Sequence, residues 1–299
     1  MKWFQILLLL AVISLKACGV ETSSDISFEN EREEQSDHEQ DFLAEDENGD
    51  SVTPSDIELS DEEIDLIEFD LSQFEDRKPK QWGEKVDGVK THMVTDEKVI
   101  ALTFDACGGP YGNGYDEELI AFLRQEQVPA TLFINERWII EHEELFLNLA
   151  NDPLFQIENH GTAHVPLSVT GKSAWGIDGT LTPEEVKEEV LGNQHTIQNL
   201  TGQAPTLFRS GTAFYDEVAV EIVQELGLEV VNFDVLGDAG ATFSATEVHQ
   251  AISKATSGSI VLLHMNQPQS GTAEGVKMAV QDLREKGYEF VTLDYASLK

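Results

Sequence analysis

The stretch VIALTFDACGG, residues 99–109, decides the fold class. Its first six residues are apolar or β-prone, and they lead directly into an acid, Asp105, which is followed by Ala106, Cys107 and two glycines. A strand that is apolar along its whole length is buried on both faces, as in a parallel sheet covered by helices. Asp105 is then either a reactive carboxylate at the edge of such a sheet or simply the polar residue at which a strand ends.

Strand-like and helix-like segments alternate after this stretch. Taking 99–104 as the first strand, the sequence predicts six more, at 130–134, 155–158, 206–209, 229–234, 260–264 and 290–293. Helical patterns lie between them, at 117–127, 139–149, 183–199, 217–226, 246–255 and 273–286. Thr182 and Ser244, each followed three residues later by glutamate, are typical helix N-caps. The alternation predicts an α/β fold with a parallel sheet, either open and doubly wound or closed into a β/α barrel.

The charge is very uneven along the chain. The formal net charge is −37, from 19 basic and 56 acidic residues, and it excludes nucleic acid or a bare anionic membrane as a partner. Between Glu21 and Asp76 there are 23 acidic side chains against the single basic Arg32, which predicts a disordered, self-repelling linker. We therefore expect a linker over 18–80 and one catalytic domain over 81–299.

The first residues, MKWFQILLLLAVISLKACG, indicate export. The apolar run 3–15 is shorter than the roughly 20 residues that a transmembrane helix needs, so residues 1–17 are expected to be a secretory signal. Leu15 to Cys18 resembles the lipobox of bacterial lipoproteins, which implies lipidation of Cys18 and a membrane anchor. Lys16 is unusual in such a box, and ordinary signal cleavage with secretion is the alternative. A lipidated Cys18 leaves Cys107 without a disulfide partner.

Five of the seven predicted strands deliver an acid, a base or a cation at or just beyond their ends: Asp105, the pair His160 and His164, Arg209, Asp234 with Asp238 close behind, and His264. The carboxyl ends of parallel strands meet at one edge of the sheet, where active sites of such folds lie. The spacing of His160 and His164 suits one divalent metal ion. The alternative is a surface pair in a segment that Pro166 ends.

Five segments in this order resemble the motifs of the polysaccharide deacetylases, the NodB-homology domain of carbohydrate esterase family four. They are LTFDACGG, QIENHGTAHVPL, PTLFRSGTAFYD, VNFDVLGDAG and IVLLHMN, and the resemblance covers about residues 85–299. It implies a distorted, TIM-like β/α barrel. It also implies a hydrolase that removes acetyl groups from N-acetylated sugars of peptidoglycan, chitin or related polymers, with a divalent metal such as zinc.

Residue by residue, the resemblance implies that Asp105 is the catalytic base, that His160 and His164 bind the metal, and that His264 is the general acid. Arg209 and Asp234 or Asp238 would support the base and the acid. These roles agree with the chemistry of amide hydrolysis, which needs an activated water, a stabilised oxyanion and a proton for the leaving amine. Asp105 beside Arg209 is expected to stay ionised, and a carboxylate is expected to raise the pKa of His264.

The sequence departs from the family pattern at the metal site. Ala106 stands where the family has its third metal ligand, an aspartate. The metal is then held by His160 and His164 with waters, or Cys107 supplies a thiolate, or Cys107 is merely a small buried residue. In a further alternative no metal is needed and Asp105 acts unaided.

Two other positions bear on the substrate. After Arg209 the family has a proline-rich segment that contacts the acetyl group, and here Thr212 stands in that region. Trp175, in a glycine-rich loop, either stacks on a sugar ring or merely packs. The sequence thus predicts an exported polysaccharide deacetylase and gives no indication of its oligomeric state. The alternatives are a non-catalytic glycan-binding lipoprotein and a metal-independent amidase.

Overall fold

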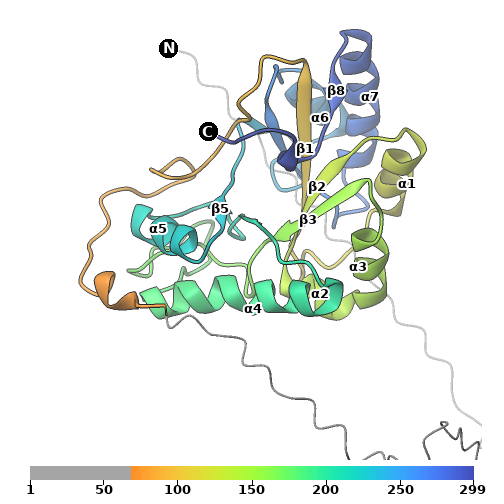
Figure 1. Ribbon diagram of the computed structural model, residues 1–299. Coiled ribbons are helices and arrows are strands. Elements are labelled where there is room, and N and C mark those ends of the chain that lie inside the picture. The colour runs from red at the N-terminus through yellow and green to blue at the C-terminus, as the bar shows by residue number, and fades with distance from the viewer. Residues whose placement is uncertain (1–68) are drawn as a thin grey trace, which may run out of the picture. The chain divides into compact units, whose positions relative to one another are not determined.

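The computed structural model describes residues 69–299. The expected signal peptide, the lipidation site Cys18 and most of the expected linker lie outside these residues. Within the described part of the chain, no helix is both long and apolar enough to cross a membrane. The described residues form one α/β unit in which helices pack around a curved sheet (Figure 1).

The sheet is parallel throughout its described pairings. Its strands follow the order β5-β4-β3-β2-β1-β7-β6, and β8 also pairs with β1. Their bounds are β1 (Val99–Ala106), β2 (Ala130–Ile134), β3 (Phe155–Asn159), β4 (Leu207–Phe208), β5 (Glu229–Val230), β6 (Val235–Leu236), β7 (Ile260–His264) and β8 (Glu289–Phe290). The sheet is a half-barrel, which confirms the prediction of a distorted β/α barrel. The segment predicted as one strand over 229–234 is instead short β5 followed by an irregular stretch that leads into β6.

Seven α-helices cover the sheet: α1 (Glu117–Gln125), α2 (Glu136–Glu141), α3 (Glu143–Ala150), α4 (Pro183–Thr201), α5 (Glu217–Glu225), α6 (Ala245–Ile252) and α7 (Thr272–Glu285), all within residues 69–299. Both expected N-caps are present. The Thr182 side chain accepts a hydrogen bond from the Glu185 amide, and Ser244 forms a reciprocal capping box with Glu247. The helix predicted over 139–149 is two helices, which meet at His142.

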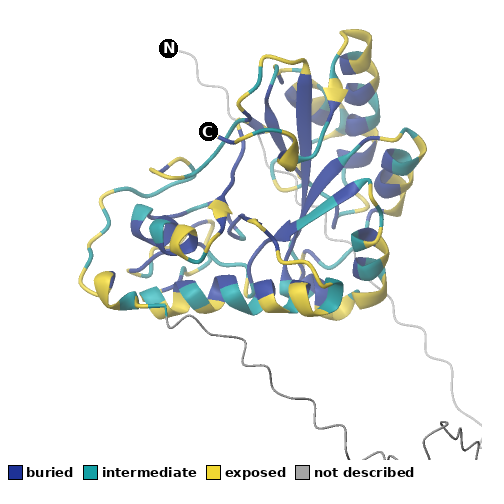
Figure 2. Cartoon of the chain, in the orientation of Figure 1, coloured by how far each residue is buried: buried dark blue, intermediate teal, exposed yellow. Residues whose placement is uncertain are grey.

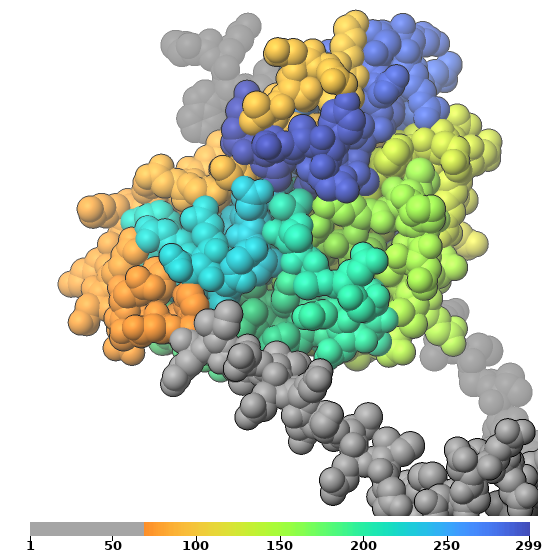
Figure 3. Space-filling model, in the orientation of Figure 1, coloured from red at the N-terminus to blue at the C-terminus, as the bar shows by residue number. Residues whose placement is uncertain are grey.

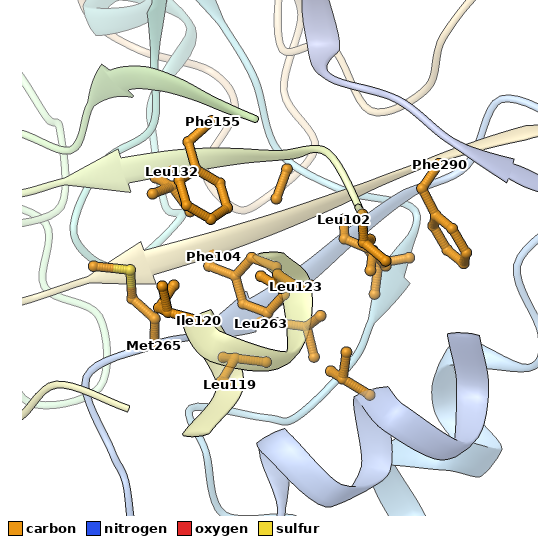
Figure 4. Packing of buried hydrophobic residues seen from close by; sticks show 14 of the residues in the cluster. Leu102, Phe104, Leu119, Ile120, Leu123, Leu132, Phe155, Leu263, Met265 and Phe290 are labelled. Carbon is orange, nitrogen blue, oxygen red and sulfur yellow. The ribbon is translucent and has the colours of Figure 1, made fainter. Parts of the chain in front are cut away.

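Strand β1 is buried along its whole length, as Figure 2 shows. Leu102 and Phe104 project to the outer face and pack with residues of α1 and β7, among them Leu123 and Leu263 (Figure 4). Ala101 projects to the opposite, inner face, within a second apolar cluster. Because side chains alternate along a strand, Asp105 lies on this inner face. The alternation therefore aims the acid into the half-barrel.

Residues 69–80, which the sequence places in the linker, belong to the folded unit. Phe74 is buried among residues of α4 and α5. Arg77 forms an ion pair with Glu221 of α5, and the Glu217 carboxylate accepts hydrogen bonds from the backbone amides at 80 and 81. Figure 3 shows this segment, in orange, against the turquoise surface to which α5 contributes. The sequence prediction missed this contact because Phe74 stands within a strongly acidic segment, which is typical of a linker.

Glu158 on β3 makes the stability of the fold depend on pH. Its side chain is buried, and its carboxylate bridges to β4 by accepting hydrogen bonds from the amides of Thr206 at 2.9 Å and Leu207 at 2.7 Å. Burial raises its pKa to about 7, although these hydrogen bonds oppose the shift. A carboxyl group with a raised pKa binds its proton more tightly in the folded state, so its stabilising contribution is lost as the pH rises through about 7.

We expect the Glu158→Gln variant to show a shallower fall in unfolding free energy between about pH 5 and about pH 8 than the wild type, by on the order of 3 kcal/mol. Some slope remains, because burial also raises the pKa of Glu189 to about 7. Denaturant titrations across this pH range measure the effect, with exposed Glu229→Gln as the control. Equal slopes in the wild type and Glu158→Gln would contradict the assignment.

Candidate active site

Asp105 is held by a fully buried arginine. The Arg209 guanidinium donates to Asp105 Oδ1 over 2.8 Å and to Thr103 Oγ1 over 2.9 Å. It also donates to two backbone carbonyls beyond β5 and lies 4.1 Å from the centre of the Phe133 ring. A guanidinium fixed on several sides gives Asp105 a charged hydrogen-bond partner and holds its side chain in place. The second carboxylate oxygen, Oδ2, lies 3.6 Å from His160 Nε2.

Cys107, His160 and His164 converge beside this carboxylate. One donor atom from each of the three lies within 4.8 Å of the other two. Cys107 Sγ is 3.9 Å from His160 Nε2, and the two imidazole rings stand nearly perpendicular with centroids 5.0 Å apart. Ala106, by contrast, projects into the apolar cluster on the outer face of β1. Ala106, which stands where the family has an aspartate, therefore points away from the site, whereas Cys107 points into it.

The three side chains suit a divalent metal ion. The His160 Nδ1–H donates to the Arg209 carbonyl oxygen over 2.9 Å, so the lone pair of Nε2 is directed at the cluster. His164 Nε2 is buried and has no hydrogen-bond partner among the described residues. Burial would raise the pKa of the Cys107 thiol, but the neighbouring histidines outweigh it and bring the pKa well below its usual value. A thiolate with two imidazoles is a ligand set typical of zinc.

His264, the last residue of β7, lies beside Asp105 on the neighbouring strand, since the two are register partners. The Asp238 carboxylate accepts from His264 Nδ1 at 2.9 Å and from the His264 amide at 2.7 Å, and Thr272 Oγ1 also donates to it. Burial would lower the pKa of His264, but the carboxylate of Asp238 overcomes it and raises the pKa well above its usual value. The arrangement keeps a protonated imidazole at the carboxyl edge of the sheet.

Of the two acids expected to support His264, the structure brings only Asp238 to it. Asp234 lies at the opposite end of β7, where it accepts from the Ile260 amide and from Ser259 Oγ, both at 2.8 Å. His264 follows Ile260 by four residue steps along the strand, which is roughly 13 Å. Asp234 therefore anchors the start of β7, and its predicted place beside His264 is wrong.

A cleft of about 730 Å³ opens above these groups. Asp105, Cys107, His164 and His264 lie at its floor, and Thr212 lines it as expected from its position in the sequence. Trp175, 76% exposed, and Tyr111, 90% exposed, contribute aromatic side chains to its walls. The Trp175 ring meets the Phe214 ring edge to face at 5.6 Å.

Two contributors were not predicted, Tyr111 and Glu189. The Glu189 carboxylate, on α4, accepts hydrogen bonds from the backbone around His164. A signal for Glu189 does exist in the sequence. It falls on the same helical stripe as Val186, Val190 and Ile197, which is buried, and a charged residue on a buried stripe needs a partner.

The chain resembles known deacetylases over this same region. Residues 92–231 match the sequence model of the family described as Polysaccharide deacetylase. The peptidoglycan-N-acetylmuramic acid deacetylase PdaA of Bacillus subtilis (strain 168) is 24% identical over 208 residues, which are 67% of this chain and 72% of that protein. The peptidoglycan-N-acetylglucosamine deacetylase PgdA of Listeria monocytogenes serotype 1/2a (strain 10403S) is 27% identical over 198 residues, or 66% of this chain, but the match spans only 38% of PgdA.

Solved structures agree on the fold. The structure of Bacillus subtilis PdaA, a family 4 carbohydrate esterase, superposes with a TM-score of 0.58 at 23% identity, covering 69% of this chain and 83% of that one. BA3943 from Bacillus anthracis, described as a CE4 family pseudoenzyme, gives a TM-score of 0.58 at 21% identity, covering 69% and 67%. Fold, ordered motifs and family match coincide on the domain that carries the cleft. By sequence over residues 92–231 and by fold, the domain that carries the cleft is therefore similar to the polysaccharide deacetylases, a group of hydrolases.

Proposed function

We propose that this protein removes N-acetyl groups from a cell-envelope or extracellular polysaccharide, either peptidoglycan or a chitin-like polymer. The observation that carries the proposal is the pairing of Asp105 with His264. An acid-base pair lies on neighbouring strands, each member with its own buried partner, beside a cluster suited to a metal ion. The names of PdaA and PgdA, which specify peptidoglycan sugars, support the substrate class.

Asp105 is the general base in this proposal. Its carboxylate lies at the cleft floor, where it can accept a proton from a water that attacks the acetyl carbonyl. Arg209 fixes the direction of the carboxylate through Oδ1, which leaves Oδ2 on the side of the metal cluster. A divalent ion bound by Cys107, His160 and His164 would polarise the carbonyl and stabilise the negative charge that develops on its oxygen.

His264 is the general acid. The amine of a sugar is a poor leaving group until it is protonated, so the reaction needs a proton donor near the nitrogen. Asp238 binds His264 through Nδ1, which leaves Nε2 as the proton donor toward the cleft. The raised pKa keeps this proton in place at neutral pH.

Trp175, Tyr111 and Thr212 bind the polymer in this proposal. Exposed aromatic rings at the walls of a cleft offer flat apolar faces to sugar rings, while Thr212 adds a hydroxyl close to the reacting groups. The backbone of Trp175 has φ 55°, which is unusual for a large side chain and is consistent with a position held for binding.

Acetate release tests the proposal. The purified full chain is incubated with N-acetylglucosamine, with its β-1,4 tetramer and with peptidoglycan, each before and after treatment with a metal chelator. We expect acetate from the polymers, loss of activity after chelation, and recovery when zinc is returned. Binding of the glycans without any acetate release would overturn the proposal in favour of a glycan-binding protein. Full activity after chelation would favour a metal-independent amidase.

A further inference from the structure

We propose that Glu189 is the positioning residue of the metal site. Its carboxylate holds the backbone over residues 163–165 in the one conformation that turns the His164 imidazole toward Cys107 and His160. This inference rests on the metal site of the proposed function. Glu189 does not contact the imidazole and acts only through the backbone that carries it.

The contacts of Glu189 are unusual for a helical carboxylate. It lies in the middle of α4, is 4% exposed, and has no cationic partner among the described ion pairs. Its oxygens accept hydrogen bonds from three consecutive amides: Ala163 at 2.7 Å, His164 at 3.0 Å and Val165 at 3.4 Å. Burial raises the pKa of Glu189 to about 7, so above that pH its carboxylate is ionised, and hydrogen bonds to an ionised acceptor are stronger than those between neutral groups. The carboxylate therefore fixes this turn directly.

His164 needs such a restraint because its backbone is strained. Its φ is 63°, in the left-handed region that residues with a side chain rarely adopt. Strain of this kind persists only where the surroundings hold it in place. If the grip on the amides were lost, the turn would be free to relax toward an ordinary conformation, and the imidazole would leave the cluster.

The turn that carries His164 is closely packed on both sides. A Cβ on Gly161 would lie 2.4 Å from Glu189 Oε1, so the backbone before the turn runs in contact with the carboxylate. On the other side, a Cβ on Gly211 would lie 2.4 Å from the His164 ring. Thr162 ties the turn to α4 as well, since its hydroxyl donates to the Glu189 carbonyl and accepts from the Asn193 amide. His164 is thus seated between the carboxylate of α4 and a glycine after β4.

Metal affinity measured without substrate tests the inference. We expect Glu189→Gln, which keeps the side-chain volume but puts an NH₂ group opposite amide donors, to bind zinc about 10–100-fold more weakly than the wild type in a chelator competition at fixed pH. The absorption spectrum of bound Co²⁺ should change too, because it reports the geometry of the ligands. Glu188→Gln, an exposed glutamate on the same helix, is the matched control and should bind as the wild type does.

The readouts separate positioning from mere structural support. A variant that melts earlier but binds zinc within about threefold of the wild type, with an unchanged Co²⁺ spectrum, would overturn the inference. Loss of a residue that positions a metal ligand typically weakens metal binding by about 10–100-fold. If Glu189→Gln does not fold, Glu189→Asp, which retains the charge on a shorter side chain, takes its place in the same assay. A wild-type protein that binds no zinc would also overturn it. Zinc binding without acetate release would contradict the proposed function and leave this inference intact.

Discussion

Replacement of Asp105 by asparagine is expected to lower kcat for acetate release about 10²–10⁴-fold, the range for loss of a general base. The amide keeps the size of the side chain but cannot take a proton from water. KM should change little, because Asp105 contacts Arg209 and the cluster at the floor of the cleft and not the aromatic walls. Zinc affinity should be largely retained, since Asp105 is not in the proposed ligand set.

The asparagine variant also leaves the Arg209 guanidinium buried without its counter-charge, which costs on the order of 3–5 kcal/mol. Thermal unfolding must therefore be measured beside the kinetics. Asp105→Glu is the matched variant: it keeps the negative charge for Arg209 but moves the carboxylate, so we expect it to stay folded and still lose most of its activity. A folded Asp105→Asn protein with kcat within a few-fold of the wild type would refute the role of the base.

Replacement of Cys107 by serine is expected to weaken zinc binding by at least about 100-fold, because it removes a direct ligand whereas loss of an outer partner alone costs 10–100-fold. The hydroxyl of serine does not ionise at neutral pH, so the cluster is left with two imidazoles. Acetate release at limiting zinc should fall with the affinity. In the Co²⁺-loaded wild type we expect a sulfur-to-cobalt charge-transfer band that the serine variant lacks.

Two further variants sharpen this experiment. Cys107→Asp replaces the thiolate with a carboxylate, so it should still bind metal but shift its preference from zinc toward harder ions such as Mn²⁺. Cys18→Ser removes the only other cysteine of the chain and should leave both the spectrum and the affinity unchanged. An unchanged cobalt spectrum in Cys107→Ser would show that the metal is held without the thiol.

Much of this site follows from strand periodicity. The sequence predicted that Asp105, Arg209 and His264 meet, because each ends a buried strand and parallel strands end at one edge. It left open whether Asp234 or Asp238 supports His264. That choice depends on where the chain leaves the sheet after β5, and the competing partners of Asp234, which are Ser259 and Ile260, come from the start of another strand. No local pattern encodes that contact.

The contribution of Glu189 was missed for a different reason. Its place on the buried stripe of α4 indicates only that it needs a partner, and the partners themselves are backbone amides 24 to 26 residues away, which carry no residue-specific signal. The start of the folded unit was placed too late for a related reason: Phe74 is one apolar residue within an acidic segment, and only its contacts on the domain show that it is buried. In both cases a long-range contact decides what the local composition leaves open.

The position of β1 between β2 and β7 makes the pairing of Asp105 with His264 depend on a contact between distant parts of the chain. β1 pairs with β2 on one side and with β7 on the other, and Thr103 and Val261, which are in contact across the second pairing, are 158 residues apart in the chain. Contacts between such distant segments form slowly, because a long loop must close first. Until β7 docks, β1 has one open edge, which is a template for association with other chains. Asp105 and His264 therefore come together only when β7 has docked on β1, which requires the closure of a long intervening loop.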